Sequence, residues 1–442
     1  MKNLFFYLVI LCVKNTHAQC FKTSSAGYQH SLSIHNNGNL YAWGKDESGE
    51  VGYPLSNLPI FNPVQITNDN DWKSVFTGLE ASFAIKNDGT LWVWGEGNSG
   101  RLGLGNNDNA FVPTKLGNDI DWKYITSSST TIAIKTDNSI WGWGSNSSGQ
   151  LGIGNTSSVL EPIKITTETD WKSIVTLGLH TLALKNNGTL WGTGKNVDGS
   201  LGDGTNIDKL VFTQIGTDTN WIQVAGGVEY SLGLKSDGTI WAWGRNYVPF
   251  QNFTIFGSQY PSRMLTPTSI SNDNTWVQIS GSSILLGLKS NGTLWDIRRD
   301  IQIGTDSDWD TIYAGGSHSL ITKTDGSLWS YGSNSFGQLG VGSGIQNTTI
   351  PLKIDCSTLK TENLSINKTV EVYPNPTSQK IFIKNRNLSR NLKFTLTDLN
   401  GKILFETKNS ISEINLEKFS KGIYLLNVEN KSEKQIFKII KE

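Results

Sequence analysis

A five-residue motif of the form Leu-Trp-x-Trp-Gly recurs, with small variations, along most of this 442-residue chain. Its clearest copies begin at Leu91, Ile140, Leu190 and Ile240, so successive starts are 49, 50 and 50 residues apart. One copy precedes this series at residues 40–44, and altered copies follow at residues 294–295 and 328–332. A fixed period of this length indicates seven copies of one structural unit.

Each copy has the pattern of a four-stranded antiparallel sheet. Residues 82–85 and 90–94 have strand periodicity, and Asn87-Asp88-Gly89 between them has the composition of a tight hairpin turn. A strand with an opening aromatic residue precedes this hairpin, and a short strand around Pro113 follows it. The opening residues are Phe21, Trp72, Trp122, Trp171, Trp221, Trp276 and Trp309. The chain is therefore predicted to be all-β, with a seven-bladed β-propeller whose Trp side chains pack between neighbouring blades.

The last hundred residues have a different composition. All 16 Trp lie between Trp43 and Trp329, and 44 of the 46 Gly lie at or before Gly344. Residues 366–442 carry 14 Lys and Arg against 8 Asp and Glu, so the neutral chain joins an acidic propeller to a basic tail. Short alternating apolar segments within residues 372–442 predict a small immunoglobulin-like β-sandwich.

The first 18 residues have the pattern of a secretory signal peptide. Lys2 precedes an apolar stretch, residues 4–13, that is shorter than the roughly 20 residues of a membrane span. No other apolar run is longer, so no membrane span is expected. We expect cleavage after Ala18, and a lipid-modified Cys20 is the alternative.

Export has consequences for the three cysteines. Cys12 would leave with the signal peptide, and the mature chain would keep Cys20 and Cys356, which flank the repeats. Export favours oxidation, so we predict a disulfide between them that fastens the first blade to the last; two free thiols are the alternative. The expected domain plan is a signal peptide (1–18), a propeller (20–356), a linker (357–371) and a C-terminal domain (372–442).

The C-terminal segment resembles the sorting domain of type IX secretion substrates, a family of Bacteroidetes export tags. The residues that carry the resemblance are Tyr373, Pro374, Asn375, Pro376, Gly401, Gly422, Tyr424 and the basic end Lys438–Lys441. The resemblance implies a partner, the type IX machinery, and passage to the outer-membrane surface or the medium, usually with removal of the tag. An accessory sandwich that binds carbohydrate or protein is the alternative.

Residues 20–355 resemble the repeats of the regulator of chromosome condensation family, in the form found in many secreted bacterial proteins. The resemblance rests on residues 27–34 and 315–320 and on the Gly-Gln-Leu-Gly segments at 145–152 and 333–340. It implies a seven-bladed propeller. It does not imply one function, because members exchange nucleotide on a small GTPase while bound to chromatin or inhibit β-lactamases.

The residues offer little for catalysis, metal binding or nucleic acid. The acidic, exported propeller is poorly suited to binding nucleic acid. His30, His180 and His318 occupy one slot of three copies, which Ile284 fills in another, so we interpret them as structural hydrogen-bonding groups rather than metal ligands. The Asp-rich turn at residues 68–71 lacks the final Glu of an EF-hand calcium loop. We expect no catalytic residues, no cofactor and no metal.

The repeat is most altered in copies five and six. After Gly244, a segment with five aromatic residues replaces the usual glycine turn, and copy six passes from Trp295 to two arginines without the Trp-Gly step. Aromatic side chains and Arg are enriched at binding hot spots, so this region is the predicted partner site. Its residues are Tyr247, Phe250, Phe253, Phe256, Tyr260, Arg298 and Arg299. The alternative is that the aromatic segment folds over and plugs the space left by the short copy.

These features together predict an exported, monomeric, non-catalytic propeller that binds an extracellular protein or glycan. Two alternatives stay open. One is a secreted inhibitor of an extracellular enzyme, and the other is an extracellular hydrolase built on a propeller scaffold.

Overall fold

The chain forms two compact units, Met1–Cys356 and Ser357–Glu442. A computed structural model describes residues 20–53, 58–248, 253–282, 284–355, 370–373, 377–385, 392–398, 402–408, 411–429 and 434–441. The expected signal peptide lies outside these residues. Within the described ranges, no helix has the length and apolar character needed to cross a membrane.

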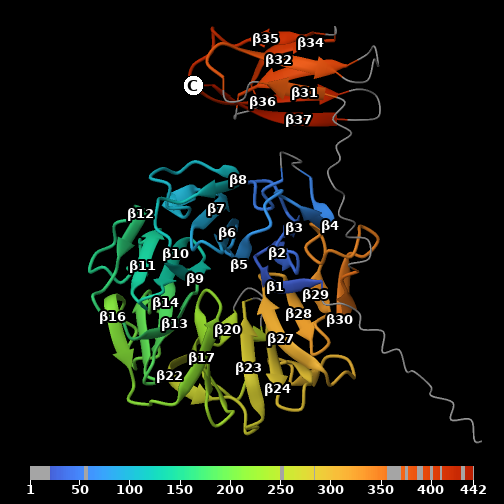
Figure 1. The fold of residues 1–442 in the computed structure, drawn as a ribbon. Helices are drawn as coiled ribbons and strands as arrows, with labels where there is room; N and C mark the ends of the chain where they lie inside the picture. Colours follow the sequence, from blue (N-terminus) through green and yellow to red (C-terminus); the bar gives the residue numbers. More distant parts are fainter. Residues whose placement is uncertain are drawn as a thin grey trace, which may run out of the picture. The chain divides into compact units, whose positions relative to one another are not determined.

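The first unit is a ring of seven four-stranded antiparallel sheets, numbered here as blades 1 to 7 (Figure 1). Blade 1 contains β1 (Phe21–Ala26), β2 (His30–His35), β3 (Leu40–Gly44) and β4 (Ile60–Gln65); blade 2 contains β5 (Trp72–Thr77), β6 (Ala81–Lys86), β7 (Leu91–Gly95), the 3-10 turn η1 (Asn98–Gly100) and β8 (Ala110–Lys115). Blade 3 contains β9 (Trp122–Ser127), β10 (Thr130–Lys135), β11 (Ile140–Gly144) and β12 (Val159–Lys164); blade 4 contains β13 (Trp171–Thr176), β14 (His180–Lys185), β15 (Leu190–Gly194) and β16 (Lys209–Ile215).

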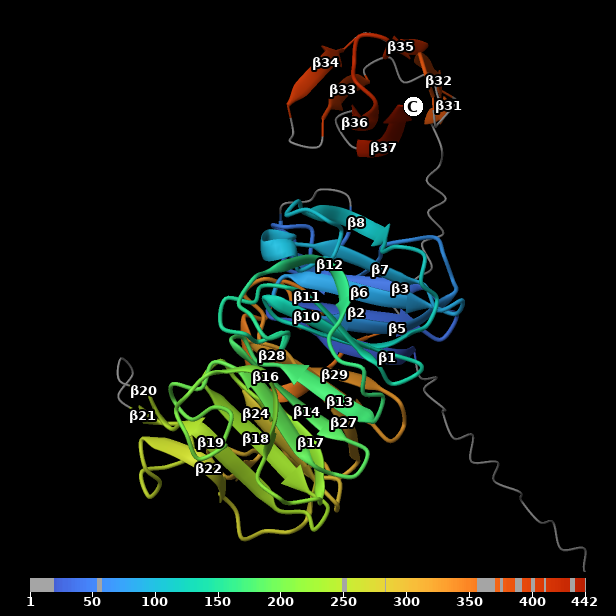
Figure 2. The same cartoon turned by 90° about the vertical axis from the view of Figure 1, so that its left-hand side faces the viewer.

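Blade 5 carries an additional hairpin. Its sheet is β17 (Trp221–Gly226), β18 (Tyr230–Lys235), β19 (Ile240–Arg245) and β22 (Arg263–Ser269), and the pair β20 (Tyr247–Val248) and β21 (Phe253–Thr254) precedes β22. Blade 6 contains β23 (Trp276–Gly281), β24 (Leu285–Lys289), β25 (Leu294–Asp296) and β26 (Ile301–Gln302); blade 7 contains β27 (Trp309–Ala314), β28 (His318–Lys323), β29 (Leu328–Ser333) and β30 (Asn347–Lys353). Figure 2 shows the ring from the side, with the β20–β21 hairpin on one face. Four strands in each of seven copies confirm the predicted propeller.

The first strand of each blade lies nearest the axis of the ring and the fourth lies at its rim (Figure 1). Second and third strands are joined by the predicted hairpin turns, as at Gly89, which has a φ of +83°. A Cβ atom at Gly89 would lie 1.7 Å from the carbonyl oxygen of Ile120 in the next blade. This glycine is therefore required both by the turn and by the close approach of the neighbouring blade.

The Trp side chains lie in hydrophobic clusters that join neighbouring blades, as predicted. Twelve of them also form pairs, one in each of blades 2 to 7, with a lysine over the two rings, which the sequence did not predict. In blade 3, Trp122 and Trp141 meet edge to face with ring centroids 6.2 Å apart, and Nζ of Lys135 lies 4.6 and 4.2 Å from their centroids. This Nζ also pairs with Asp119 at 2.7 Å and Asp121 at 3.0 Å. Burial opposes the charge, but the hydrogen bonds to the two carboxylates raise the pKa of Lys135 above its ordinary value. The corresponding lysines are Lys86, Lys185, Lys235, Lys289 and Lys323.

The ring closes without exchanging a strand, because each four-stranded sheet in the described part of the ring takes all its strands from one copy of the repeat. Contacts between blade 7 and blade 1 include the Trp43 indole N–H donating to the Gln338 carbonyl at 2.9 Å and the Gly342 N–H donating to the Phe61 carbonyl at 3.0 Å. Cys20, directly before β1, is disulfide-bonded. Cys356 lies outside the described residues, so the Cys20–Cys356 pairing stays a prediction.

The second unit is a two-sheet β-sandwich. One sheet contains β31 (Val370–Tyr373), β32 (Lys380–Asn385) and β35 (Glu413–Asn415), and the other contains β33 (Lys393–Thr397), β34 (Ile403–Thr407), β36 (Gly422–Glu429) and β37 (Lys434–Lys441). Phe394, Leu396 and Leu426 are in its core. Tyr424 of the sorting motif is buried and donates to the Ser420 carbonyl. Pro374, Asn375, Pro376 and Gly401 lie outside the described residues.

Candidate functional site

A typical joint between blades uses the loop after the third strand of one blade as the acceptor for two donors of the next. At the joint between blades 1 and 2, the Glu50 carbonyl accepts from the Ser82 hydroxyl at 2.6 Å and from the Trp94 indole N–H at 3.0 Å. His30 Nε2 lies 2.9 Å from the same hydroxyl. Because that hydroxyl donates to the carbonyl, His30 must donate through Nε2–H. Burial lowers the pKa of His30 to about 4, which keeps the imidazole neutral.

The same arrangement recurs around the ring. His180 contacts Ser231, and His318 contacts Ser31, through Nε2 at 2.9 and 2.7 Å. The loop carbonyls that accept both a hydroxyl and an indole N–H belong to Glu50, Arg101, Ser200 and Gln338. These contacts give the three histidines the hydrogen-bonding role that was predicted for them.

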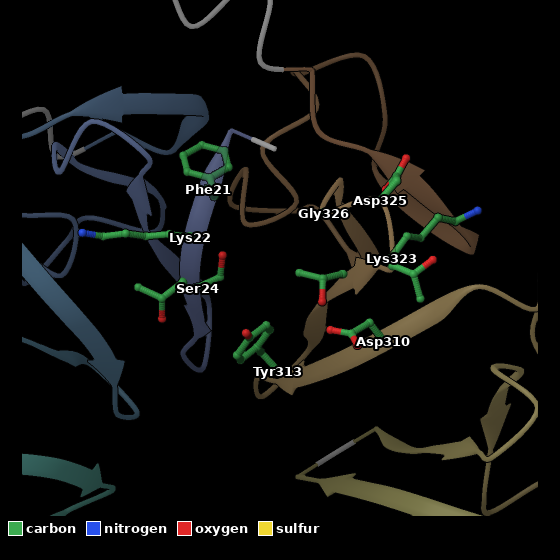
Figure 3. Close-up of a pocket in the computed structure, with 11 residues that line it drawn as sticks. Phe21, Lys22, Ser24, Asp310, Tyr313, Lys323, Asp325 and Gly326 are labelled. Carbon is green, nitrogen blue, oxygen red and sulfur yellow. The ribbon is translucent and has the colours of Figure 1, made fainter. Parts of the chain in front are cut away.

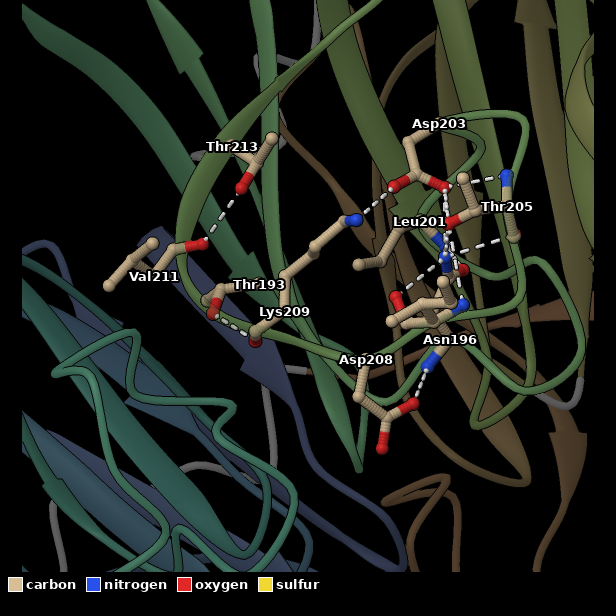
Figure 4. A network of polar contacts seen from close by, with 10 residues as sticks. Thr193, Asn196, Leu201, Asp203, Thr205, Asp208, Lys209, Val211 and Thr213 are labelled. Atoms are coloured by element: carbon tan, nitrogen blue, oxygen red, sulfur yellow. Dashed lines mark hydrogen bonds and ion pairs between the residues drawn. The ribbon is translucent and has the colours of Figure 1, made fainter.

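A buried Asn holds the loop after the third strand in blades 3, 4 and 7: Asn146, Asn196 and Asn334 each accept from the N–H five residues ahead, and Asp46 does the same in blade 1. Figure 4 shows Asn196 in blade 4, whose Oδ1 accepts from the Leu201 N–H at 2.9 Å while its Nδ2 donates to Asp203 Oδ1 at 2.9 Å and to the Thr205 carbonyl at 3.1 Å. Lys209 pairs with the other carboxylate oxygen of Asp203 at 3.1 Å. Leu201, directed into the joint by this anchor, belongs to the hydrophobic core.

The joint between blades 5 and 6 replaces these polar contacts with apolar ones. Asn246 is kept, and its Oδ1 accepts from the Phe256 N–H at 2.8 Å, so Phe256 occupies the place of Leu201. Phe256 is only 7% exposed and belongs to the same hydrophobic cluster as Leu285, the residue of blade 6 that stands in the Ser82 slot. Ile297, in the slot of the indole donor, packs against this cluster. Blade 6 therefore has neither of the two side-chain donors that a loop carbonyl of blade 5 would accept from.

The joint between blades 6 and 7 keeps the hydroxyl of blade 7 but has lost the groups of blade 6 that would bond it. Blade 6 turns directly from β25 to β26 without the usual loop. Blade 7 still carries Ser319 paired in register with Tyr331, which stand in the slots of Ser82 and Trp94. The Ser319 hydroxyl is fully buried and has no hydrogen-bond partner. Ile284 fills the histidine slot of blade 6 and offers no donor, so both usual partners of this hydroxyl are missing.

Charged residues of the blade 6 turn surround this joint. Asp296 is buried, and Arg299 pairs with it at 3.7 Å while its own side chain is 62% exposed. Burial raises the pKa of Tyr331, and Asp296, Arg299 and Arg298 are the charged groups that act on it. Arg298 also acts on the pKa of Tyr230 in blade 5, which burial raises. Arg298 and Arg299 therefore lie by the joint between blades 6 and 7, called the incomplete joint below. They lie near Ser319 and Tyr331, which have no loop carbonyl to donate to.

The residues predicted as one partner site divide between the two joints. Phe256 is in the core, Tyr260 packs against the same cluster, and both thus support the plug alternative for the aromatic segment. Tyr247 is 36% exposed, the backbone of Phe253 pairs with Val248 in the β20–β21 hairpin, and Phe250 lies outside the described residues. Arg298 and Arg299 lie on the blade 6 turn by Tyr331. Ser319 and Tyr331 were not predicted from the sequence as site residues. One signal could have identified Ser319: copy seven keeps the Ser-Leu pair of other copies although copy six, before it, lacks the loop that this Ser would bond.

Two glutamates on blade 2 come close enough to test the hydrolase alternative. Glu80 and Glu96 share a hydrogen bond; burial raises the pKa of Glu96, whereas the pKa of Glu80 is lowered by Lys45 despite burial. Lys45 pairs with Glu80 at 2.9 Å and Arg101 pairs with Glu96 at 2.8 Å. Each carboxylate thus has its own cation, which is the arrangement of a structural ion-pair network. Within the described ranges, no three His, Cys, Asp or Glu side chains gather in a way that could hold a metal ion.

Comparison with known families agrees with this architecture. Residues 371–442 match the secretion system C-terminal sorting domain. Residues 88–132, 137–184 and 325–370 match the regulator of chromosome condensation (RCC1) repeat, and a second form of that repeat matches residues 25–50, 221–248 and 309–338. The chain is an RCC1-repeat propeller with a sorting domain. The sorting domain directs export through the type IX secretion system to the cell surface or the extracellular space, as predicted.

Individual relatives share only parts of the RCC1-repeat propeller. It is 30% identical over 115 residues to the human X-linked retinitis pigmentosa GTPase regulator, covering 25% of this chain and 11% of that protein. It is 32% identical over 111 residues to the guanine nucleotide exchange factor SRM1 of Saccharomyces cerevisiae, covering 22% and 23%. The matched stretch thus spans less than a quarter of either relative. The crystal structure of human WBSCR16 matches with a TM-score of 0.62 at 19% identity, covering 71% of this chain and 93% of that one, which shows the fold.

Proposed function

We propose that the exported RCC1-repeat propeller is a non-catalytic binding protein for an extracellular protein, and that it recognises this partner at the joint between blades 6 and 7. The observation that carries the proposal is the buried Ser319 hydroxyl, which lacks a partner where the five regular joints supply a loop carbonyl. A buried hydroxyl without a partner costs roughly 1–3 kcal/mol. The joint between blades 5 and 6 exchanged its donors for Leu285 and Ile297, so an apolar solution was available to this fold.

The chemistry of the joint favours a peptide loop as the ligand. The groups that remain occupy the positions that donate to a backbone carbonyl at the regular joints. A protein loop carries a backbone carbonyl at every residue. Arg299 is exposed beside the joint and is suited to an acidic side chain on such a loop. Entry requires the half-buried side chains of Ile284 and Tyr331, which pack at this joint, to shift. Inhibition of an extracellular enzyme would be one consequence of such binding.

The test compares capture by wild-type secreted protein with capture by Arg299→Glu. The bait is immobilised and exposed to proteins released from surfaces that the exporting cell meets, and bound chains are quantified by mass spectrometry. Proteins retained by the wild type should fall at least tenfold with Arg299→Glu. Lys172→Glu, a matched charge reversal at an exposed position of β13, should retain them. Equal capture by Arg299→Glu, or no specific capture by the wild type, would contradict the proposal.

A further inference from the structure

A separate pocket of about 340 Å³ lies where the ring closes, between blade 7 and blade 1 (Figure 3). One wall is β1, including Phe21 and Ser24, and the other is formed by Asp310 and Tyr313 of β27, Thr322 of β28 and the turn that follows. Its volume is at the lower end of the roughly 300–1,000 Å³ that ligand pockets occupy. It lies away from the blade 6 turn and shares no lining residue with the joint described above.

The other six seams of the ring are closed at this level by a pair of aliphatic side chains in one hydrophobic cluster. One member comes from the end of the second strand and the other from the first strand of the next blade. The pairs are Ile34 with Val75, Ile85 with Ile125, Ile134 with Ile174, Leu184 with Val224, Leu234 with Ile279, and Leu288 with Ile312. At the closing seam the same two register positions hold Thr322 and Ser24. The aliphatic pair is replaced by two hydroxyls at this one seam.

The opening aromatic residue also differs here. Blade 1 begins with Phe21 where the other six begin with Trp, and Phe21 is buried against Tyr41 and Trp43. The smaller ring and the two hydroxyl side chains together leave space and polarity where the other seams have packed hydrocarbon. Burial of an aliphatic pair stabilises the fold by removing apolar surface from water, so the closing seam lacks a stabilising contact that the other six seams keep.

The charged groups of the lining indicate what the pocket accepts. Nζ of Lys323 pairs with Asp306 at 2.8 Å and Asp308 at 2.9 Å, and Nζ of Lys22 donates to the Trp72 carbonyl at 2.8 Å. Both amines point away from the space between the walls (Figure 3). The lining cations are thus already neutralised or directed elsewhere, whereas Asp310 and Asp325 add carboxylates. An anionic ligand is therefore disfavoured.

The remaining groups are hydrogen-bonding and aromatic. Burial, together with Asp310, raises the pKa of Tyr313, so its phenol stays protonated and can donate. Hydrogen bonds from Ser327 lower the pKa of Asp325, so this carboxylate stays ionised and can accept. Thr322 adds a hydroxyl that can do both. Carboxylates and hydroxyls beside aromatic rings suit the hydroxyls and C–H faces of a sugar.

We propose that this pocket binds the end of a neutral saccharide, independently of the protein-binding joint. The ligand donates its hydroxyls to Asp310 and Asp325, accepts from Tyr313, and lies beside the edge of Phe21 that lines the pocket. Thr322 supplies the polar side chain of the seam, and the small Ser24, whose hydroxyl bonds that of Ser33 at 2.8 Å, leaves the space open. The site thus adds recognition of a glycan to a propeller that reaches the cell surface or the extracellular space.

The experiment titrates the complete secreted protein with neutral mono- and disaccharides, using glucose, galactose, mannose, N-acetylglucosamine, maltose, cellobiose and lactose. Binding is detected by saturation-transfer NMR and quantified by calorimetry. At least one sugar should bind, and Thr322→Ile, which restores the aliphatic residue of the other blades, should weaken it at least tenfold without lowering the melting temperature. Asp310→Asn should also weaken it.

The control is Asp237→Asn, which changes the residue of blade 5 that corresponds to Asp325 and should leave sugar binding unchanged. Binding to none of the sugars, or equal binding by Thr322→Ile, would overturn the proposal. Arg299→Glu should keep sugar binding and Thr322→Ile should keep protein capture, so failure of one proposal is distinguishable from failure of the other.

Discussion

The joint between blades 1 and 2 and the joint between blades 6 and 7 have side chains in equivalent donor positions but differ in the partners that the neighbouring blade offers them. The Ser82 hydroxyl bonds a loop carbonyl and a histidine, and the Trp94 indole donates to the same carbonyl, whereas the Ser319 hydroxyl has no partner. Blade 7 thus keeps the hydroxyl donor of a regular joint although blade 6 no longer supplies the loop that would accept from it. Groups retained without a structural partner are the ones that an external partner can use.

The largest expected effect comes from acid, and it acts through the joints that contain histidine. Burial lowers the pKa of His180 and His318 to about 3 and that of His30 to about 4, below the ordinary value of 6.5. The unfolded chain therefore takes up protons first as the pH falls below about 6.5. Stability is fully present above that pH and is lost toward the folded values, at roughly 1.4 kcal/mol per pH unit for each histidine.

Thermal unfolding measured between pH 7.5 and pH 4.5 checks this expectation. The melting temperature should fall steeply over the interval, and His180→Gln should make the dependence shallower while lowering stability at pH 7.5. The joints with Tyr230 and Ile284 in the same slot contribute nothing to this histidine titration. A pH dependence unchanged by His180→Gln would show that the histidine joints do not respond as described.

The second expected effect compares the regular loop with the aromatic plug. Leu201→Ala and Phe256→Ala remove equivalent side chains from the joints of blades 4 and 5, and each should cost roughly 2–5 kcal/mol of unfolding free energy. Urea unfolding followed by tryptophan fluorescence measures both. Val197→Ala, at an exposed position of the blade 4 loop, should stay within about 0.5 kcal/mol of wild type. A cost below about 1 kcal/mol for Phe256→Ala would remove the support for the plug.

The regular part of the propeller could be predicted from the sequence because its signals are local. The spacing of the Trp motif defines the copies, and turns such as Asn87-Asp88-Gly89 define the hairpins. Phe256 could not be placed from the sequence because the Asn anchor is present in both blades while the number of residues it spans differs. Asn196 holds a residue five positions ahead, and Asn246 holds one ten positions ahead. A loop of different length thus reaches the same place in space.

The lysine clusters and the closing-seam pocket were missed for a related reason. Lys135 meets Trp122 and Trp141 across three strands, and the contact appears only when the strands are paired. Thr322 and Ser24 look unremarkable along the chain. They stand out when the blades are aligned by register and compared with the aliphatic pairs of the other six seams.

A third, smaller effect is expected at the regular polar joint. Ser82→Ala removes the hydroxyl that donates to the Glu50 carbonyl and accepts from His30, leaving a buried N–H without a partner. The cost should be roughly 1–3 kcal/mol, measured by the same urea unfolding. Ser82→Thr, which keeps a hydroxyl as Thr131 and Thr181 do in blades 3 and 4, should recover most of it. Equal losses for both variants would assign the effect to packing and not to the hydrogen bonds.

The smallest expected change, and the one of opposite sign, is Ser319→Ala at the incomplete joint. The hydroxyl is buried without a partner, so removing it relieves a desolvation penalty instead of breaking a bond. Stability should be unchanged or higher by up to about 1 kcal/mol, while Ser82→Ala at the equivalent position is destabilising. Protein capture should weaken with Ser319→Ala, because the donor offered to the partner's carbonyl is gone. If Ser319→Ala costs as much as Ser82→Ala, the hydroxyl already has a partner within the ring, and the difference between the two joints disappears.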